Sequence, residues 1–155
     1  MKNLDLVFML NSGILDITNH ELPASSAYKV VKFRSAVNKT FKKIQGLEED
    51  ILKDVGIEDP QVLNKRLKEL NAIKNRTEEQ EAELNELCTK RDRYNKLRED
   101  MLQEKLTLEN VETISYEDWH TLRKENKPKK DGGQDPLNNY VENLLEDILW
   151  AAPEN

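Results

Sequence analysis

Two histidines and one cysteine are the residues of this chain most suited to act as bases, nucleophiles or metal ligands. His20 lies in an expected turn, His120 in an expected short helix, and Cys88 on the apolar seam of an expected long helix. A Cys/His nucleophile needs an activating motif, and none surrounds these residues. The sequence also has no Gly-rich phosphate loop, HExxH pair or calcium loop. We therefore expect a protein that is not an enzyme and that uses no metal or cofactor.

Six basic residues between Asn19 and Ile44 form the strongest charge signal. After Glu21 this stretch contains no acid, although the protein has a net charge of −6. Such a run can neutralise phosphates, which makes nucleic-acid binding a lesser alternative. Four of the lysines flank an apolar seam instead, where basic residues usually pair with acids of a partner helix. The candidate protein contacts are Lys29, Lys32, Lys39 and Lys43.

Acids that can neutralise this stretch occur in two places. One set lies on the expected return helix and comprises Glu81, Glu83, Glu86, Asp92, Glu99 and Asp100. The other lies in the tail, which from Asp131 onward has six acids and no Lys or Arg. The tail also carries an apolar stripe that needs burial, so we expect its helix, Leu137 to Ala151, to dock on another subunit or a partner. Its candidate contacts are Tyr140, Leu144, Leu145, Ile148 and Trp150.

Composition predicts the elements that position these residues. The chain has 155 residues, of which 37% are hydrophobic and 35% charged, with only five Gly and five Pro. These values favour a helical, elongated protein over a sandwich or barrel. No stretch approaches the eighteen apolar residues of a membrane span, and Asp5 interrupts the apolar patch at the start, so we expect no membrane segment or export signal.

The first half of the chain predicts two helices. The stretch NLDLVFMLNSGILDITN suits a helix, and the turn NHELP follows it. A long helix is expected from Ala24 to Asp54, with Gly56 just past its end. Its seam repeats every seven residues, with two further apolar residues beside it. The seam residues are Val30, Phe33, Val37, Ile44, Leu47 and Ile51.

Residues 60 to 107 allow either one helix or two. The spacing of Leu63, Leu67, Leu70 and Leu84 permits an unbroken helix from Pro60. The sequence TEEQ at Thr77 to Gln80 has the pattern of a capping box, which favours a break near Asn75 to Thr77. We expect the helix Thr77 to Thr107 to pack antiparallel to the helix Ala24 to Asp54. In that pairing Val37, Ile44 and Leu47 face Leu87, Tyr94 or Met101.

The last part of the chain predicts a short helix, a linker and a final helix. Ser115 and Asp118 mark the start of the short helix, and Asn126 to Pro136 is rich in Pro, Gly and charge. The expected division is a helical hairpin domain over residues 1–125, a linker over 126–136 and a C-terminal amphipathic helix over 137–152. The fold class is all-α: a long antiparallel, coiled-coil-like helical hairpin with short flanking helices and a tethered C-terminal helix.

Two stretches carry a family resemblance: LPASSAYKVVKFRSAVNKTFKKIQGLEEDILKDVGI and LTLENVETISYEDWHTL. In them the chain resembles a poorly characterised family of small helical tailed-bacteriophage proteins. The matching features are the turn Leu22 to Ala24, the run Ala27 to Lys29 that opens a long basic helix, and the entry to a short helix at Ile114 and Ser115. The sequence departs from the family at Pro60 to Arg76 and in the tail. The resemblance implies phage encoding and a helical hairpin, but no catalytic or binding residue.

We expect a phage-encoded binding or assembly protein that acts through protein–protein contacts, as a virion component or in the host cytoplasm. An alternative is a phage-encoded inhibitor of a host enzyme or defence complex. A homo-oligomer is expected, because a thin seam stabilises a lone hairpin poorly and a second hairpin would bury the other face.

Overall fold

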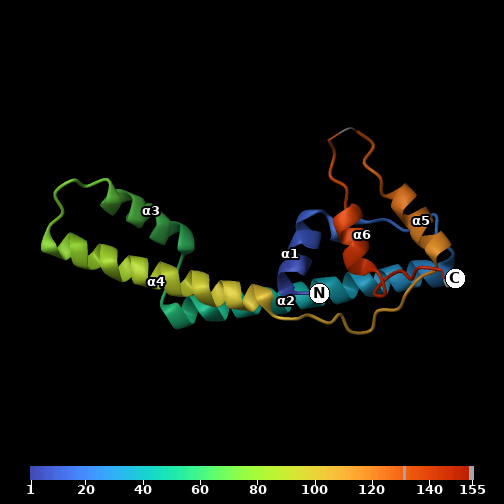
Figure 1. The fold of residues 1–155 in the computed structure, drawn as a ribbon, viewed down its shortest axis with the longest axis horizontal. Coiled ribbons are helices and arrows are strands. Elements are labelled where there is room, and N and C mark those ends of the chain that lie inside the picture. The colour runs from blue at the N-terminus through green and yellow to red at the C-terminus, as the bar shows by residue number, and fades with distance from the viewer. Residues whose placement is uncertain (131, 154–155) are drawn as a thin grey trace. The chain divides into compact units, whose positions relative to one another are not determined.

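A computed structural model describes residues 1–130 and 132–153, and over these residues the chain forms helices and no strands (Figure 1). The predicted all-α class is confirmed. The elements are α1 (Asn3–Asn11), the 3-10 helix η1 (Ile14–Asp16), α2 (Ala24–Val55), α3 (Pro60–Asn71), α4 (Glu78–Gln103), α5 (Tyr116–Glu125) and α6 (Asn139–Leu145).

The chain divides into two compact units. Unit 1 comprises Met1–Lys43 together with the chain from Glu104 onward, and unit 2 comprises Ile44–Gln103. Helix α2 contributes its N-terminal part to unit 1 and its C-terminal part to unit 2. The segment that the sequence predicts as a tethered C-terminal helix therefore lies within unit 1.

Local signals set the ends of the first two helices. The Asp5 carboxylate accepts a hydrogen bond from the Lys2 N–H at 2.7 Å, which caps the start of α1. Gly13, with φ of 91°, ends the helical path before η1, so the first helix is shorter than the sequence predicts. At the end of α2, Gly56 has φ of 82° and donates to Lys53, while Ile57 donates to Leu52. This Schellman ending confirms the predicted stop.

Unit 1 has a core formed by helices and the tail together. Its largest fully buried side chains come from α1, α2, α5 and the C-terminal segment; they include Leu6, Met9, Phe33, Trp119, Leu122, Leu137, Leu145 and Leu149. Ser26 of α2 donates a hydrogen bond to Asp118 of α5. Tyr140 of α6 donates to Asp5 of α1 at 2.8 Å. These hydrogen bonds connect α2 to α5 and α6 to α1 around the apolar core.

The C-terminal helix is shorter than the predicted range Leu137 to Ala151, because α6 ends at Leu145. Glu146 takes an extended conformation and Asp147 a positive φ of 63°. The chain then turns, and the Asp147 N–H donates to the Trp150 carbonyl at 2.7 Å. The turn places Trp150 against Trp119, so burial of an aromatic side chain outweighs two further turns of helix.

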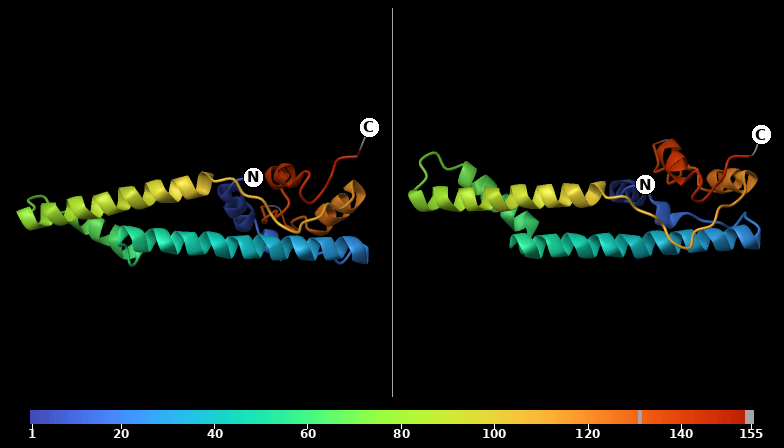
Figure 2. Two further views of the ribbon diagram at one scale, coloured as in Figure 1. Left: turned by 90° about the horizontal axis from the view of Figure 1, so that it is seen from below. Right: turned by 60° about the horizontal axis from the view of Figure 1, so that its bottom comes forward.

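In unit 2 the region between Pro60 and Gln103 forms two helices, α3 and α4, which lie side by side (Figure 2). The Asp59 carboxylate caps α3 by accepting from Gln61 N–H at 2.9 Å. Thr77 and Gln80 exchange the two hydrogen bonds of a capping box at 2.9 and 3.2 Å. The predicted break and its cause are therefore confirmed.

The core of unit 2 is a cluster of aliphatic side chains from α2, the turn after it, α3 and α4: Val55, Ile57, Leu63, Leu67, Leu70 and Leu84. Ile44 is also buried, as the seam predicts, but Leu47 is 43% exposed. The prediction that Leu47 belongs to a buried seam is wrong. Apolar spacing alone does not show how wide a helical face the neighbouring helices cover.

Four polar contacts show how α4 runs along the C-terminal part of α2 within unit 2. Near the middle of α2, the Glu48 carboxylate accepts hydrogen bonds from Tyr94 at 3.0 Å and from Arg98 at 2.8 Å. Near its end, the Asp54 carboxylate lies 3.8 Å from the Arg93 guanidinium. Just past its end, the Gly56 carbonyl accepts a hydrogen bond from Lys90 at 3.3 Å. Residue numbers rise along one helix as they fall along the other. The two segments are antiparallel within this unit.

Helix α4 ends at Gln103 rather than at the predicted Thr107. The next residues pair with the start of the chain: the Asn3 N–H donates to Glu104 at 3.0 Å and the Leu106 N–H to Met1 at 2.8 Å. These long-range hydrogen bonds replace the bonds of a further helical turn. Residues 104–114 then cross unit 1 without helical structure.

Candidate binding groove on helix α2

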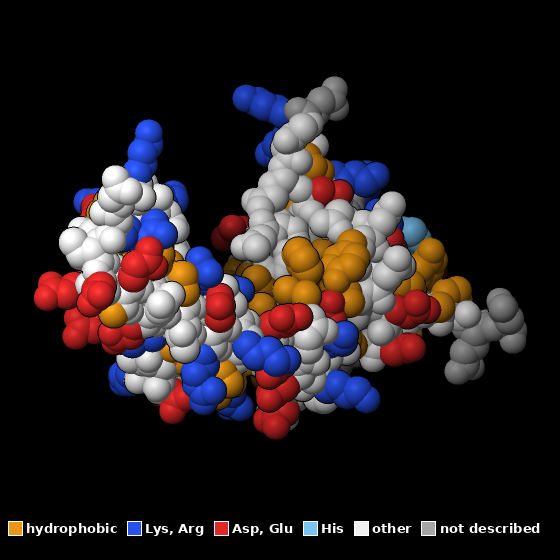
Figure 3. Space-filling model, turned by 60° about the vertical axis from the view of Figure 1, so that its left-hand side comes forward, with side chains coloured by type: hydrophobic (Ala, Val, Ile, Leu, Met, Phe, Trp, Pro, Cys, Tyr) orange, Lys and Arg blue, Asp and Glu red, His pale blue; other side chains and the backbone are white. Residues whose placement is uncertain are grey.

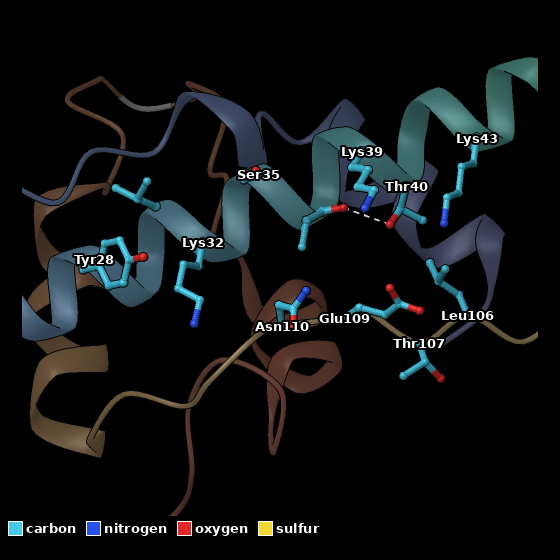
Figure 4. Close-up of a pocket in the computed structure, with 12 residues that line it drawn as sticks. Tyr28, Lys32, Ser35, Lys39, Thr40, Lys43, Leu106, Thr107, Glu109 and Asn110 are labelled. Atoms are coloured by element: carbon cyan, nitrogen blue, oxygen red, sulfur yellow. Dashed lines mark hydrogen bonds between the residues drawn. The ribbon is translucent and has the colours of Figure 1, made fainter.

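An open groove of about 410 Å³ lies in unit 1 beside the N-terminal part of α2. One wall is a face of α2, and the other is the segment Leu106 to Asn110 that follows α4 (Figure 4). We call this the α2 groove. The residues that line it are Tyr28, Val31, Lys32, Ser35, Ala36, Lys39, Thr40, Lys43, Leu106, Thr107, Glu109 and Asn110.

Helical geometry explains why these side chains share one wall. Residues three, four and seven apart lie on one face of a helix, and Lys32, Ser35, Lys39 and Lys43 have that spacing. The Thr40 hydroxyl donates back to the Ala36 carbonyl at 2.8 Å, so it is partly satisfied within α2. The wall therefore presents ammonium and hydroxyl groups alternating with small apolar groups.

The positive charge of the groove is only partly neutralised. Lys32 lies 3.5 Å from Glu112 and 5.7 Å from the centre of the Tyr28 ring. Within residues 1–130 and 132–153, Lys39 and Lys43 have no ion-pair or hydrogen-bond partner. Both are exposed. These two ammonium groups are available to a ligand.

Exposed apolar groups accompany the charge. Tyr28 is 63% exposed and Val31 45% exposed, both at the end of the groove near the start of α2. Large apolar side chains in water are ordinary when they are isolated, but these two lie three residues apart beside a hollow. The groove thus combines apolar contact area with unpaired charge.

The structure separates the four lysines that the sequence selects. Lys32, Lys39 and Lys43 line the groove, whereas Lys29 is half-buried outside it and donates to the Thr113 carbonyl at 3.2 Å. Arg34 in the same stretch donates to the Ile17 carbonyl at 3.0 Å. In the basic stretch, Lys29 and Arg34 thus bind backbone carbonyls of unit 1, whereas the other three lysines named here line the groove.

Five of the six acids of α4 that were expected to neutralise the basic stretch have partners close to them. Glu81 pairs with Arg76, Glu83 with Arg66, Glu86 with Lys90, and Asp100 with Lys96. In the tail, Glu142 pairs with Arg123 at 2.9 Å. The pairs of Glu86 and Asp100 lie one turn apart on α4, whereas Glu83 and Glu142 meet cations of a neighbouring helix. On the face drawn in Figure 3, side chains of both charges are interspersed.

The tail residues proposed as contacts occupy different environments. Leu145 and Trp150 are buried by the chain itself, so neither is free surface. Leu144 and Ile148 are half-buried, and Tyr140 is 49% exposed with its ring edge against Phe8. Much of the apolar face that the sequence identified is therefore covered within unit 1.

Sequence reasoning missed the second wall of the groove and its apolar end. Residues 106 and 107 of that wall were expected to belong to the helix Thr77 to Thr107. Tyr28 and Val31 offered a local signal, because they are large apolar residues that lie off the seam of Val30 and Val37. No local signal could reveal that residues 106–110 return to α2.

A second hollow, of about 260 Å³, lies in unit 2 between the end of α2, α3 and α4. Three of its charged groups are already paired: Arg66 binds both oxygens of Glu83, at 2.7 and 2.9 Å, and Lys90 donates to Gly56. The Arg66 guanidinium lowers the pKa of the Glu83 carboxyl. With both of its cations paired, this hollow offers an anionic ligand less than the α2 groove does.

The residues considered for catalysis do not form a recognisable site within either unit. His20 and His120 are exposed, and the His120 ring lies against Tyr116 at 4.4 Å. Cys88 is half-buried beside the apolar cluster of unit 2. Over residues 1–130 and 132–153, no group of three or more His, Cys, Asp or Glu is placed to hold a metal ion. None of the helices described has the length and apolar character needed to cross a membrane.

Comparison with known proteins yields no match to a family model, to a curated protein or to a solved structure.

Proposed function

We propose that this protein is a non-enzymatic binding module whose α2 groove contacts a protein partner. The observation that carries the proposal is the presence of exposed Tyr28 and Val31 beside the unpaired Lys39 and Lys43 in one groove. Protein interfaces commonly combine an aromatic residue and apolar contact area with a polar, charged rim. Both walls belong to unit 1, whose buried core supports them.

The sequence resemblance to small tailed-bacteriophage proteins supports a phage-encoded role in assembly, as a virion component and in oligomeric form. Mass spectrometry of purified particles tests this part of the proposal. We expect the chain in the particles at a copy number comparable to that of other minor structural proteins. Its absence from particles, while it is abundant in infected cells, would favour the alternative role of an inhibitor directed at a host protein.

Site-specific crosslinking tests the groove itself. A photoreactive amino acid at Ser35, which is exposed within the groove, should form a product with a defined partner protein in infected cells. The same group at Asn64, exposed on α3, should not form that product. We expect Val31→Glu to reduce the Ser35 product about tenfold, because it places charge in apolar contact area. Val62→Glu, at an exposed valine of α3, is the matched control.

The test compares the crosslinked products formed by the probes at Ser35 and at Asn64. If Ser35 and Asn64 yield the same products, or if Val31→Glu leaves the Ser35 product unchanged, the groove is not the binding surface.

A further inference from the structure

We infer that the α2 groove takes an acidic, extended segment of its protein partner; this inference rests on the proposed function and specifies the ligand. Positive charge is the first reason. Lys39 and Lys43 have no described partner, and the Lys32 ammonium lies 3.5 Å from the exposed Glu112 carboxylate. Carboxylates are the groups on a polypeptide that complement such a row of ammonium groups.

Spacing favours an extended conformation for the bound segment. Lys39 and Lys43 are four residues apart, so their Cα atoms are separated by about 6 Å along the helix axis. An extended chain places side chains of the same face about 6.6 Å apart, at residues i and i+2. Two acids separated by one residue therefore match these two lysines. The apolar end of the groove, at Val31 and Tyr28, then takes an apolar residue that flanks the acids.

The second wall is suited to the same ligand. Among the described residues, the N–H groups of Thr107 and Glu109 make no hydrogen bond to protein. An extended peptide can pair its backbone with residues 106–108, which precede the turn at Glu109 and Asn110, as in β-strand addition. Glu109 also lies on this wall, and in Figure 4 its carboxylate points toward α2, so the carboxylates of the ligand compete with it for Lys39 and Lys43.

Other occupants fit the groove less well. None of the described acids of the tail lines the groove: Glu142 binds Arg123, and Asp147 lines an adjacent hollow that shares Leu106 and Thr107 with it. A nucleic acid gains affinity with each phosphate neutralised, but only three lysines line the groove, and Glu109 and Glu112 lie beside them. The chain as a whole carries a charge of −6. An acidic peptide is short, so it needs only to complement the lysines that line the groove.

Fluorescence anisotropy with the full chain tests the inference. The probe is a labelled peptide of about ten residues that has a Leu-Val pair followed by Glu-Ser-Glu, and the reference peptide has Gln in place of Glu. At physiological salt we expect the Glu peptide to bind about tenfold more tightly than the Gln peptide. Hydrogen exchange at residues 107–110 should slow when the Glu peptide binds. A single-stranded DNA oligonucleotide is the competing probe.

Three charge reversals on one helix provide matched variants. Lys39→Glu and Lys43→Glu should each weaken binding about fivefold or more, because each removes a facing charge and adds repulsion. Lys42→Glu makes the same change in net charge on an exposed residue outside the groove, and should change affinity less than about twofold. Circular dichroism establishes that the variants keep the helical fold.

Several results would overturn the inference. Equal affinity for the two peptides, an equal effect of Lys42→Glu, or tighter binding of DNA would each show that the groove does not select an acidic segment. Self-association that is lost in Lys39→Glu would identify a second copy of the chain as the occupant. If the Ser35 crosslink persists while peptide selectivity is absent, protein binding stands and only the acidic ligand is wrong.

Discussion

Trp119 of α5 and Trp150 of the C-terminal turn stack with ring centroids 5.8 Å apart and planes inclined by only 14°. Glu142 of α6 accepts a hydrogen bond from each of the two indoles. Its carboxylate accepts from Trp119 Nε1 at 3.0 Å, and its carbonyl accepts from Trp150 Nε1 at 2.8 Å. Each indole thus has a polar partner although the rings are buried. The stack holds the end of the described chain on unit 1.

Replacing Trp150 with Ala should destabilise unit 1 by about 3 kcal/mol, the lower end of the range for a buried Trp. The cost comes from the cavity, the lost stack and the unpaired carbonyl of Glu142. Urea denaturation followed by near-UV circular dichroism measures the change. Asn143→Ala, at an exposed residue of α6, is the control and should change stability by less than about 0.5 kcal/mol. A similarly small effect of Trp150→Ala would show that the tail is not packed on α5.

Ile44 and Leu47 provide a matched pair on α2. Ile44 is 4% exposed and Leu47 43% exposed, although the apolar spacing treats both as seam residues. We expect Ile44→Ala to cost about 2–4 kcal/mol and Leu47→Ala less than about 1 kcal/mol. Chemical denaturation of the two variants beside the wild type measures both. Equal losses would mean that Leu47 is covered in solution, for example by another subunit.

Thr77→Ala should lower stability by about 1 kcal/mol, because it removes the hydroxyl that accepts from the Gln80 N–H at the start of α4. Thr77→Ser keeps the acceptor and should restore most of the loss. Hydrogen exchange should accelerate at the first turn of α4 in the Ala variant only. Thr89→Ala, at an exposed hydroxyl in the middle of α4, is the comparison and should not be destabilising. If Thr77→Ala and Thr89→Ala behave alike, the capping box contributes nothing.

Glu125 at the end of α5 should make stability depend on pH. Burial opposes its ionisation, but hydrogen bonds from Thr18 and from the N–H groups of Glu21 and His20 outweigh that effect and lower the pKa of the carboxyl. A carboxyl whose pKa is lower in the folded state stabilises the fold above its unfolded pKa of about 4.3. That contribution is lost as the pH falls through the folded-state pKa.

We therefore expect Glu125→Gln to cost about 1 kcal/mol at neutral pH, with a smaller difference from the wild type at about pH 3. Urea denaturation at both pH values measures it. Glu104→Gln, which changes an exposed carboxyl, should shift stability little at either pH. A Glu125→Gln effect that stays the same at both pH values would show that the ionised carboxylate does not hold the turn at His20 and Glu21.

The ends of several helices could be predicted from the sequence because capping is local. Thr77 with Gln80, Ser115 with Asp118, and Gly56 each satisfy backbone groups within a few residues, and the structure shows all three in those roles. The all-α class follows equally from composition and from apolar periodicity. A pattern of nearby residues is sufficient to predict a helix end when the capping hydrogen bonds join residues that are close in sequence.

The candidate site was only half predictable. The basic stretch and three of its four selected lysines could be found from the sequence, because a helix fixes which residues share a face. The sequence could not show which of these lysines have no ion-pair or hydrogen-bond partner. Lys29 meets the carbonyl of Thr113, and Lys39 meets no described partner, although the two have similar sequence neighbours.

The sequence by itself thus determined the helices, their caps and the concentration of positive charge on α2. Tertiary structure decided that residues 104–114 leave the helix and form the second wall of the groove, that Leu47 stays half-exposed, and that Trp150 is buried against Trp119. The physical reason is that burial and long-range hydrogen bonding depend on which distant segments meet. Local propensity differs by less than about 1 kcal/mol per residue, so a few such contacts, as between Leu106 and Met1, override it.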